Sequence, residues 1–232
     1  MSANSSTNAV LTGVAIEARD LVRTFQIGNN RIEVLKQVNL TVKRGEKLFL
    51  CGPSGAGKTS LLYTLAGLEK PNSGEVMING NSLYSLSRSG QAKIRNTEMG
   101  YVFQSFFLLP ELTAIENVMV PAMLRGRKAK ERAMHLMERV GLQDRANHLP
   151  TELSGGEQQR VAIARSLVNN PAIIFADEPT GNLDTKTGAS VMSLLMDLAE
   201  EHERTLLVVT HDTELASTGD RKVTLVDGLI EN

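Results

Sequence analysis

The sequence contains one cysteine, no tryptophan and few aromatic residues of any kind, only 4% of 232 residues. A single cysteine excludes a fold held together by disulfide bonds, and such a chain is typical of a reducing compartment. Cys51 lies in an apolar run, where we expect a small buried side chain. A chain of this length can bury roughly 70–75% of its unfolded surface, which is enough for a hydrophobic core without covalent staples.

Long apolar runs and an excess of one charge are missing as well. No stretch of 18 apolar residues occurs, and the first 13 residues lack the basic start and apolar segment of a signal peptide. Lysine and arginine number 25 against 26 aspartates and glutamates, for a formal charge of −1. Such a charge gives no general attraction to nucleic acid or to an anionic membrane. We therefore expect a soluble, cytoplasmic globular chain whose residues 1–13 are frayed.

Short runs of aliphatic and β-branched residues alternate with helical patterns, which favours an α/β fold with a mostly parallel sheet. The strands are expected at residues 46–51, 99–103, 172–177, 205–210 and 222–226. Asn79-Gly80 follows another apolar run and predicts a hairpin, hence a small antiparallel addition in the N-terminal half. Residues 113–124 and 128–140 have helical periodicity with no strand between them, which indicates an inserted helical lobe.

The segment GPSGAGKT follows an apolar strand, precedes an apolar helix and matches the pattern G-x-x-x-x-G-K-[ST]. Glycines let successive backbone N–H groups face one anion, and the helix N-terminus adds partial positive charge. Lys58 would reach the β- and γ-phosphates, and the Thr59 hydroxyl would bind Mg²⁺. The pattern predicts a nucleoside triphosphate site formed by Gly52, Pro53, Ser54, Gly55, Ala56, Gly57, Lys58, Thr59 and Ser60.

Two acidic residues end a later apolar strand. Asp177 stands at its carboxyl end, where it can hold Mg²⁺. Glu178 comes next and can deprotonate a water molecule that attacks the γ-phosphate. Strands that end in acidic residues are common, so this interpretation depends on the phosphate loop earlier in the chain.

A second anion-binding pattern, LSGGEQQR, occupies residues 153–160. Ser154 and Glu157 have the spacing of a capping box, which by itself would explain the start of a helix. A serine hydroxyl, two glycines and a helix N-terminus also form an anion site. One triphosphate cannot readily use two such sites in one lobe, so we expect the second to face a phosphate held by another copy. This second site, called the signature nest below, comprises Ser154, Gly155, Gly156 and Glu157.

Residues 153–160 resemble the ABC signature, and the motifs over about residues 14–230 resemble, in order, an ABC transporter nucleotide-binding domain. The resemblance implies a P-loop NTPase (RecA-like) core with an N-terminal antiparallel β subdomain and an inserted α-helical subdomain. It also implies a single domain, residues 14–232. Its core would be residues 14–103 and 171–232, and its helical part residues 104–170.

The resemblance assigns further roles. Phe25 matches the aromatic residue that stacks on adenine, although its amphipathic surroundings also suit a core position. Gln104, in GYVFQ, matches a glutamine that contacts Mg²⁺ and the attacking water, although it could instead be a solvated strand end. Asp184, in GNLD, lies in a segment similar to the D-loop, and His211 is similar to the switch histidine on the γ-phosphate. The implied catalytic residues are Lys58, Gln104, Glu178 and His211, and the implied Mg²⁺ ligands are Thr59, Gln104 and Asp177.

By the same resemblance, the working unit is a homodimer that sandwiches two ATP molecules and hydrolyses them. It would act on a separate integral membrane subunit, which would hold it peripherally on the cytoplasmic face of the inner or plasma membrane. Phe106 and Phe107 follow Gln104 and would suit a groove for that subunit; alternatively, they pack the core of the helical lobe.

The segments VFQSFFLLP and DEPTGNLD are similar to the bacterial ABC ATPases of lipoprotein release and macrolide efflux. Those ATPases act with membrane proteins that bear large periplasmic domains. A cell-division-type complex, in which the ATPase pair signals across the membrane without moving a substrate, has motifs that would look alike and stays open. ABC proteins that act on ribosomes or DNA usually carry two cassettes or long coiled-coil insertions, which do not fit within 232 residues.

Overall fold

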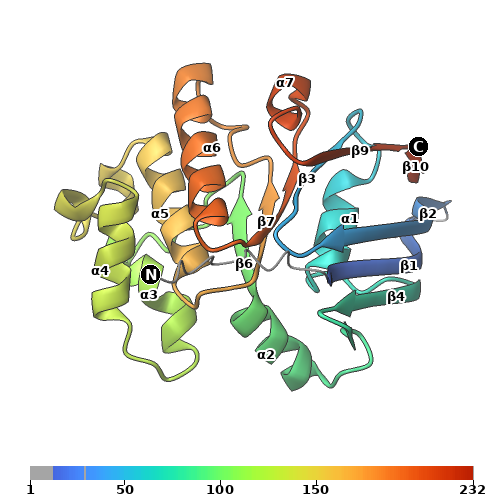
Figure 1. Cartoon of the computed structure of the whole chain (residues 1–232), viewed down its shortest axis with the longest axis horizontal. Coiled ribbons are helices and arrows are strands. Elements are labelled where there is room, and N and C mark those ends of the chain that lie inside the picture. The colour runs from blue at the N-terminus through green and yellow to red at the C-terminus, as the bar shows by residue number, and fades with distance from the viewer. Residues whose placement is uncertain (1–12, 29, 232) are drawn as a thin grey trace, which may run out of the picture.

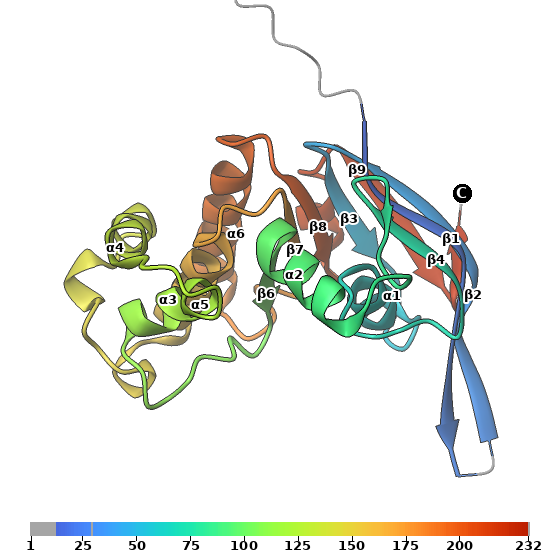
Figure 2. The ribbon, with the colours of Figure 1, turned by 90° about the horizontal axis from the view of Figure 1, so that it is seen from below.

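Figures 1 and 2 show the protein as a computed structural model, which describes residues 13–28 and 30–231. The predicted frayed N-terminus, residues 1–13, lies outside the described residues except for Gly13. The carbonyl of Gly13 accepts a hydrogen bond from the amide of Arg44 at 2.9 Å. No helix in the described ranges has the length and apolar character needed to cross a membrane.

A six-stranded sheet in the order β10-β9-β3-β8-β7-β6 runs through the middle of the molecule. Its strands are β3 (Lys47–Cys51), β6 (Met99–Phe103), β7 (Ile173–Asp177), β8 (Thr205–Val209), β9 (Arg221–Val226) and β10 (Leu229–Glu231). Neighbouring strands are parallel except for β9 and β10. The mostly parallel sheet is thus confirmed, and each of the five expected strands matches an observed one to within one residue at either end.

Successive residues of the central strands point to opposite faces of this sheet, and both faces are covered. Leu48 and Leu50 of β3 belong to the hydrophobic core on one face, whereas Phe49 and Cys51 belong to the core on the other. Cys51 is 3% exposed, as expected for a small buried side chain. Burial raises the pKa of its thiol.

A second, antiparallel sheet has the strand order β2-β1-β4-β5. Its strands are β1 (Val14–Ile27), β2 (Asn30–Lys43), β4 (Ser73–Ile78) and β5 (Asn81–Ser82). Asn79 and Gly80 connect β4 to β5 with φ of 48° and 80°, which confirms the predicted hairpin. The antiparallel part is larger than the small addition expected, because β1 and β2 span 14 residues each. Helix α1 (Lys58–Leu65) packs between the two sheets (Figure 2).

Helices between β6 and β7 form the inserted lobe predicted from the sequence (Figure 1). The lobe contains α3 (Ala114–Met123), α4 (Lys130–Arg139), α5 (Gly155–Leu167) and two short 3-10 helices, Gln143–Arg145 and Pro150–Glu152. Thr113 and Glu116 form a capping box that starts α3, and Gly141, at φ 71°, follows the end of α4. The remaining helices are α2 (Arg88–Glu98), α6 (Thr185–Glu200) and α7 (Thr213–Ala216).

The register of the parallel sheet brings four strand ends to one edge. Phe103 pairs with Asp177, Asp177 with Val209, and Val209 with Leu50. The segments that follow leave the sheet side by side at its carboxyl edge, where ligand sites of open α/β sheets lie. They carry the phosphate loop, Gln104, Glu178 and His211.

Candidate functional site

The phosphate loop is a tight connection between β3 and α1 that requires glycine. Gly52, Gly55 and Gly57 have φ of 143°, 80° and 101°, a region that other residues rarely adopt. A Cβ atom at Gly52 would lie 2.0 Å from Leu225 O, and one at Gly57 would lie 2.7 Å from Val34 O. The backbone of the loop therefore depends on these glycines. Pro53, Ser54 and Gly55 lie exposed at its tip, while Ala56 is buried.

Helix α1 starts directly after this loop without a side-chain cap from the described residues and without an acidic residue in its first turn. Its first backbone N–H groups and its partial positive charge are thus available to a ligand. Lys58 Nζ donates to the carbonyls of Gly52 and Pro53, both at 2.9 Å. The ammonium group lies over the loop and pairs with no carboxylate among the described residues. This arrangement suits phosphate groups.

Thr59 and Asp177 bring two oxygen atoms together beside the loop. Thr59 Oγ1 donates to Asp177 Oδ1 at 3.1 Å. Burial raises the pKa of Asp177, while hydrogen bonds from Tyr63 and Thr59 lower it. Tyr63 was not predicted from the sequence as part of this site. Burial and the Asp177 carboxylate raise the pKa of Tyr63 to about 12.

These oxygen atoms suit Mg²⁺, which binds through few protein ligands and completes its octahedron with water and phosphate oxygens. The described part of the chain contains no group of three or more His, Cys, Asp or Glu side chains that could hold a metal alone. A cation at Thr59 and Asp177 would therefore need the phosphates of a bound nucleotide as further ligands.

Glu178 leaves β7 in a left-handed conformation, with φ of 42°. Its amide donates to Val209 O at 3.0 Å, which ties the turn to β8. His211 Nδ1 lies 3.2 Å from Glu178 Oε2, and both side chains reach solvent. A carboxylate held at the sheet edge beside a histidine can accept a proton from water. The structure thus brings together two residues that lie far apart in the sequence.

Gln104 is joined to the segment 181–184. Its Nε2 donates to Asn182 Oδ1 at 3.1 Å, and Asn182 Nδ2 donates to Gln104 O at 2.9 Å. A Cβ at Gly181 would lie 2.8 Å from Gln104 Nε2, so a larger residue there would displace the Gln104 amide from its present position. Nothing in the sequence predicted that Asn182 would form hydrogen bonds with Gln104. Asp184 caps α6 by accepting from Thr187 N at 3.0 Å, and hydrogen bonds from Thr187 lower its pKa.

The signature nest forms the N-terminus of α5, and the expected capping box is present. Ser154 Oγ and Ser154 N donate to Glu157 Oε2 at 2.7 and 2.8 Å, and these bonds lower the pKa of Glu157. Gly156 is buried, and a Cβ there would lie 2.5 Å from Thr187 Cγ2. Ser154 is exposed and Gly155 half-buried, so these two residues form the accessible part of the nest.

The nest and the phosphate loop belong to opposite sides of the six-stranded sheet. Apolar residues of α1 pack in the core on one face, and those of α5 pack in the core on the other. Figures 1 and 2 both show α1 and α5 separated by the strands.

Phe25 lies on β1, half-buried and outside both hydrophobic cores that the described residues form. The Arg23 guanidinium lies 4.5 Å from the centre of its ring and covers one face. A cation–π contact of this kind holds the ring in place. The alternative of a core position for Phe25 is thus not supported.

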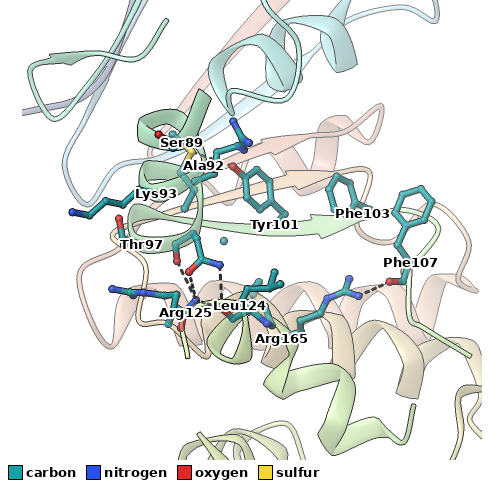
Figure 3. A pocket seen from close by; sticks show the side chains of 17 residues that line it. Ser89, Ala92, Lys93, Thr97, Tyr101, Phe103, Phe107, Leu124, Arg125 and Arg165 are labelled. Atoms are coloured by element: carbon teal, nitrogen blue, oxygen red, sulfur yellow. Dashed lines mark hydrogen bonds between the residues drawn. The ribbon is translucent and has the colours of Figure 1, made fainter. Parts of the chain in front are cut away.

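A groove of about 820 Å³ lies between α2, β6 and the C-terminal ends of α3 and α5 (Figure 3). Tyr101, Phe103 and Phe107 form an aromatic wall, and Phe107 is 61% exposed. Among the described residues that line the groove none is acidic, whereas four are basic: Lys93, Arg95, Arg125 and Arg165.

The two phenylalanines after Gln104 have different environments. Phe107 reaches the groove, whereas Phe106 does not line it. The ring of Phe106 lies at the signature nest, where a Cβ on Gly155 would be 3.8 Å from Phe106 Cζ. The two adjacent phenylalanines look alike in the sequence, so this difference in their environments was not predicted.

Comparisons with known proteins agree with this site. The family model described as ABC transporter matches residues 35–181. The "Lipoprotein-releasing system ATP-binding protein LolD" of Syntrophotalea carbinolica is 49% identical over 93% of this chain and 96% of the relative. The "Uncharacterized ABC transporter ATP-binding protein YbbA" of Escherichia coli strain K12 is 47% identical, with 93% and 96% covered.

Among solved structures, a dimeric structure of the bacterial ABC transporter cassette MJ0796 superposes with a TM-score of 0.87 at 45% identity. That alignment covers 94% of this chain and 97% of the cassette. A second MJ0796 structure, in a post-hydrolysis state with ADP and Pi, gives the same score at 44% identity. The expected P-loop fold and ATPase activity are confirmed by these matches. The chain therefore belongs to the ABC transporter family.

Proposed function

We propose that the chain is the ATP-hydrolysing subunit of a bacterial ABC complex. Two copies would sandwich two ATP molecules and drive a conformational change in a separate membrane subunit. One observation carries the proposal. The N-terminus of α1, the Thr59–Asp177 pair and the Glu178–His211 pair all lie at the carboxyl edge of the parallel sheet. Each group required for attack of water on a bound triphosphate is present there.

Within this site the chain's own residues divide the work. The loop amides and Lys58 would bind the phosphates, and Thr59 and Asp177 would hold Mg²⁺. When bound, Mg²⁺ offsets the negative charge that develops on the phosphate oxygens. Glu178 takes the proton of the attacking water, and His211 orients Glu178 and contacts the γ-phosphate. Gln104 would contact Mg²⁺ and the attacking water, and Phe25 would stack on adenine.

The separation of the two anion sites supports a dimer. Because α1 and α5 lie on opposite faces of the sheet, a phosphate in the loop of one copy would be free to meet the Ser154 nest of another copy. Ser154 would exchange its bond with Glu157 for one with the phosphate. The dimeric state of the MJ0796 cassette supports this arrangement. In it, residues 104–170 act as a helical subdomain beside a core of residues 14–103 and 171–232.

The groove supports a membrane partner. Its aromatic wall and its four basic side chains fit an amphipathic segment with apolar and acidic side chains (Figure 3). The relatives named for lipoprotein release favour a transport complex of the lipoprotein-release or macrolide-efflux type over the cell-division-type alternative. We place the chain on the cytoplasmic face of the membrane through this subunit.

The test is Glu178→Gln in the full chain with MgATP. This substitution keeps the shape of the side chain but removes the proton acceptor. Turnover should fall by about 10²–10⁴, the usual contribution of a general base. ATP should remain bound, and the mass in solution should be that of two chains. Turnover at the parent rate would remove Glu178 as the base, and a persistent monomer would contradict the sandwich.

A further inference from the structure

Two consecutive phenylalanines after Gln104 adopt left-handed backbone conformations. Phe106 has φ of 59° and Phe107 has φ of 47°, values that bulky residues seldom take. Their amides donate within the turn, from Phe106 to Phe103 O at 3.3 Å and from Phe107 to Ser105 O at 2.5 Å. Strain of this kind persists only where the surroundings enforce it, and it gathers at functional sites.

Arg165, near the C-terminal end of α5, enforces this turn. Its Nη2 donates to Phe106 O at 2.6 Å. Its Nη1 donates to Phe107 O at 2.5 Å, the bond drawn in Figure 3. The planar guanidinium presents two parallel donors, which a lysine cannot do. No carboxylate of the described residues forms an ion pair with Arg165, and burial lowers its pKa to about 10. Arg165 is half-buried in the wall of the groove, and a cation that loses part of its hydration needs hydrogen-bond acceptors, which the carbonyls of Phe106 and Phe107 supply.

The turn that Arg165 holds touches two functional places. The Phe106 ring lies at Gly155 in the signature nest. The Phe107 ring lies in the groove, edge-on to Phe103 with ring centres 5.2 Å apart. A change in α5 or in the turn therefore reaches the nest and the groove together.

Helix α5 is also fixed to the catalytic edge. Gln159 is fully buried, and its Nε2 donates to Pro179 O at 2.7 Å, one residue after Glu178. The helix thus joins the hydrolytic turn, the nest and the Phe106–Phe107 turn. Such a chain of packed and hydrogen-bonded groups can carry coupling when one member has two arrangements.

We propose that Arg165 is a positioning residue that transmits nucleotide binding at the signature nest to the groove, by holding Phe106 and Phe107 on α5. The inference rests on the proposed ATP sandwich, because only a second copy brings a phosphate to Ser154. A phosphate there presses on Gly155 and the adjoining Phe106 ring. Arg165 keeps the backbone of the turn attached to α5, so the displacement appears at Phe107.

The experiment measures amide hydrogen exchange of Phe106, Phe107 and Leu109 in the full chain carrying Glu178→Gln, with and without MgATP. All three amides are hydrogen-bonded, so their exchange reports opening of the turn. In this parent, ATP should produce the dimer and change their exchange about tenfold, within the usual range for coupling between two sites.

Adding Arg165→Met keeps an unbranched apolar stem and removes both donors. The variant should still dimerise with ATP. Because its turn is no longer held to α5, adding ATP should change the exchange of the three amides by less than about twofold. Arg165→Lys keeps the charge without the fork and should give an intermediate response. If Arg165→Met fails to fold or to dimerise, the ATP response of Arg165→Lys still tests the proposal.

Arg132→Met is the matched control. Arg132 also donates to backbone carbonyls at the end of α5, to Val168 O at 2.6 Å and Leu167 O at 3.1 Å, away from the turn. This variant should keep the full ATP response. Arg165 variants that respond like the parent, or an Arg132 variant that loses the response equally, would overturn the inference.

The parent chain separates the two proposals. A parent that dimerises with ATP but shows no change at the three amides refutes the relay and leaves the proposed function intact. A parent that does not dimerise refutes the sandwich, and the relay falls with it.

Discussion

His211 Nδ1 lies 3.2 Å from Glu178 Oε2, although the two residues follow different strands, β8 and β7. Glu178 has a left-handed backbone, with φ of 42°, and its amide is bonded to Val209 O. The position of the carboxylate therefore depends on the turn and on the histidine. Loss of the His211 side chain should therefore disturb the geometry of Glu178.

His211→Ala should lower kcat for ATP about 100-fold, the loss that a misplacement of about 1 Å can cause. The KM for ATP should change much less than kcat, because only one phosphate contact is lost and the phosphate loop is untouched. Steady-state ATPase assays measure both constants. His202→Ala, at an exposed site, is the control and should behave like the parent. A kcat unchanged by His211→Ala would mean that Glu178 needs no such support.

Asp177→Asn should raise the thermal stability of the nucleotide-free chain while it abolishes MgATP turnover. Burial raises the pKa of this carboxyl, so the native fold disfavours its charged form. Asparagine keeps an oxygen acceptor for Thr59 and removes the charge. Each kcal/mol gained raises the Tm by about 2–4 °C in a chain of this size.

The effect depends on pH with a definite sign. A carboxyl whose pKa is raised on folding contributes stability below its ordinary pKa of about 4, and this contribution is lost as pH rises through the native value. The advantage of Asp177→Asn should therefore be small near pH 4 and larger at pH 7. Asp197→Asn, exposed on α6, is the control. A variant less stable than the parent at pH 7 would contradict the prediction.

Phe107→Ser should weaken association with the membrane subunit and leave the ATPase activity of the isolated chain intact. The side chain is 61% exposed and lines the groove, so its removal takes apolar surface from the proposed interface and disturbs no core. Co-purification and coupled transport in a reconstituted complex measure the effect. Leu109→Ser, also exposed but outside the groove, should keep the association. Equal behaviour of the two variants would count against the groove.

The sequence predicted the parallel strands well because most of them are short apolar runs that are largely buried on both faces. β7 and β8, for example, are buried at every position. The long antiparallel strands were harder to predict, since β2 is exposed through its first four residues and its burial becomes regular only further along. Exposed strand segments lack the apolar pattern on which prediction relies.

The phosphate loop, Asp177 and the Glu178–His211 edge were predictable because motif and strand end coincide in the sequence. Tyr63, Gln159 and Asn182 were not, since each acts through a contact that only the tertiary fold creates. The sequence does contain a signal for Arg165, which is a basic residue in a helix whose neighbouring positions are buried. The role of Arg165 depends on the Phe106–Phe107 turn, and no local sequence pattern predicts that turn.

The most direct measurement of the central claim is the mass in solution, with MgATP, of Glu178→Gln and of Glu178→Gln combined with Ser154→Arg. Ser154 is exposed in the nest, so arginine there should block the partner copy's phosphate without touching the phosphate loop of its own chain. We predict a dimer for the first protein and, for the second, a monomer that still binds ATP. A dimer of equal stability for both would contradict the shared site.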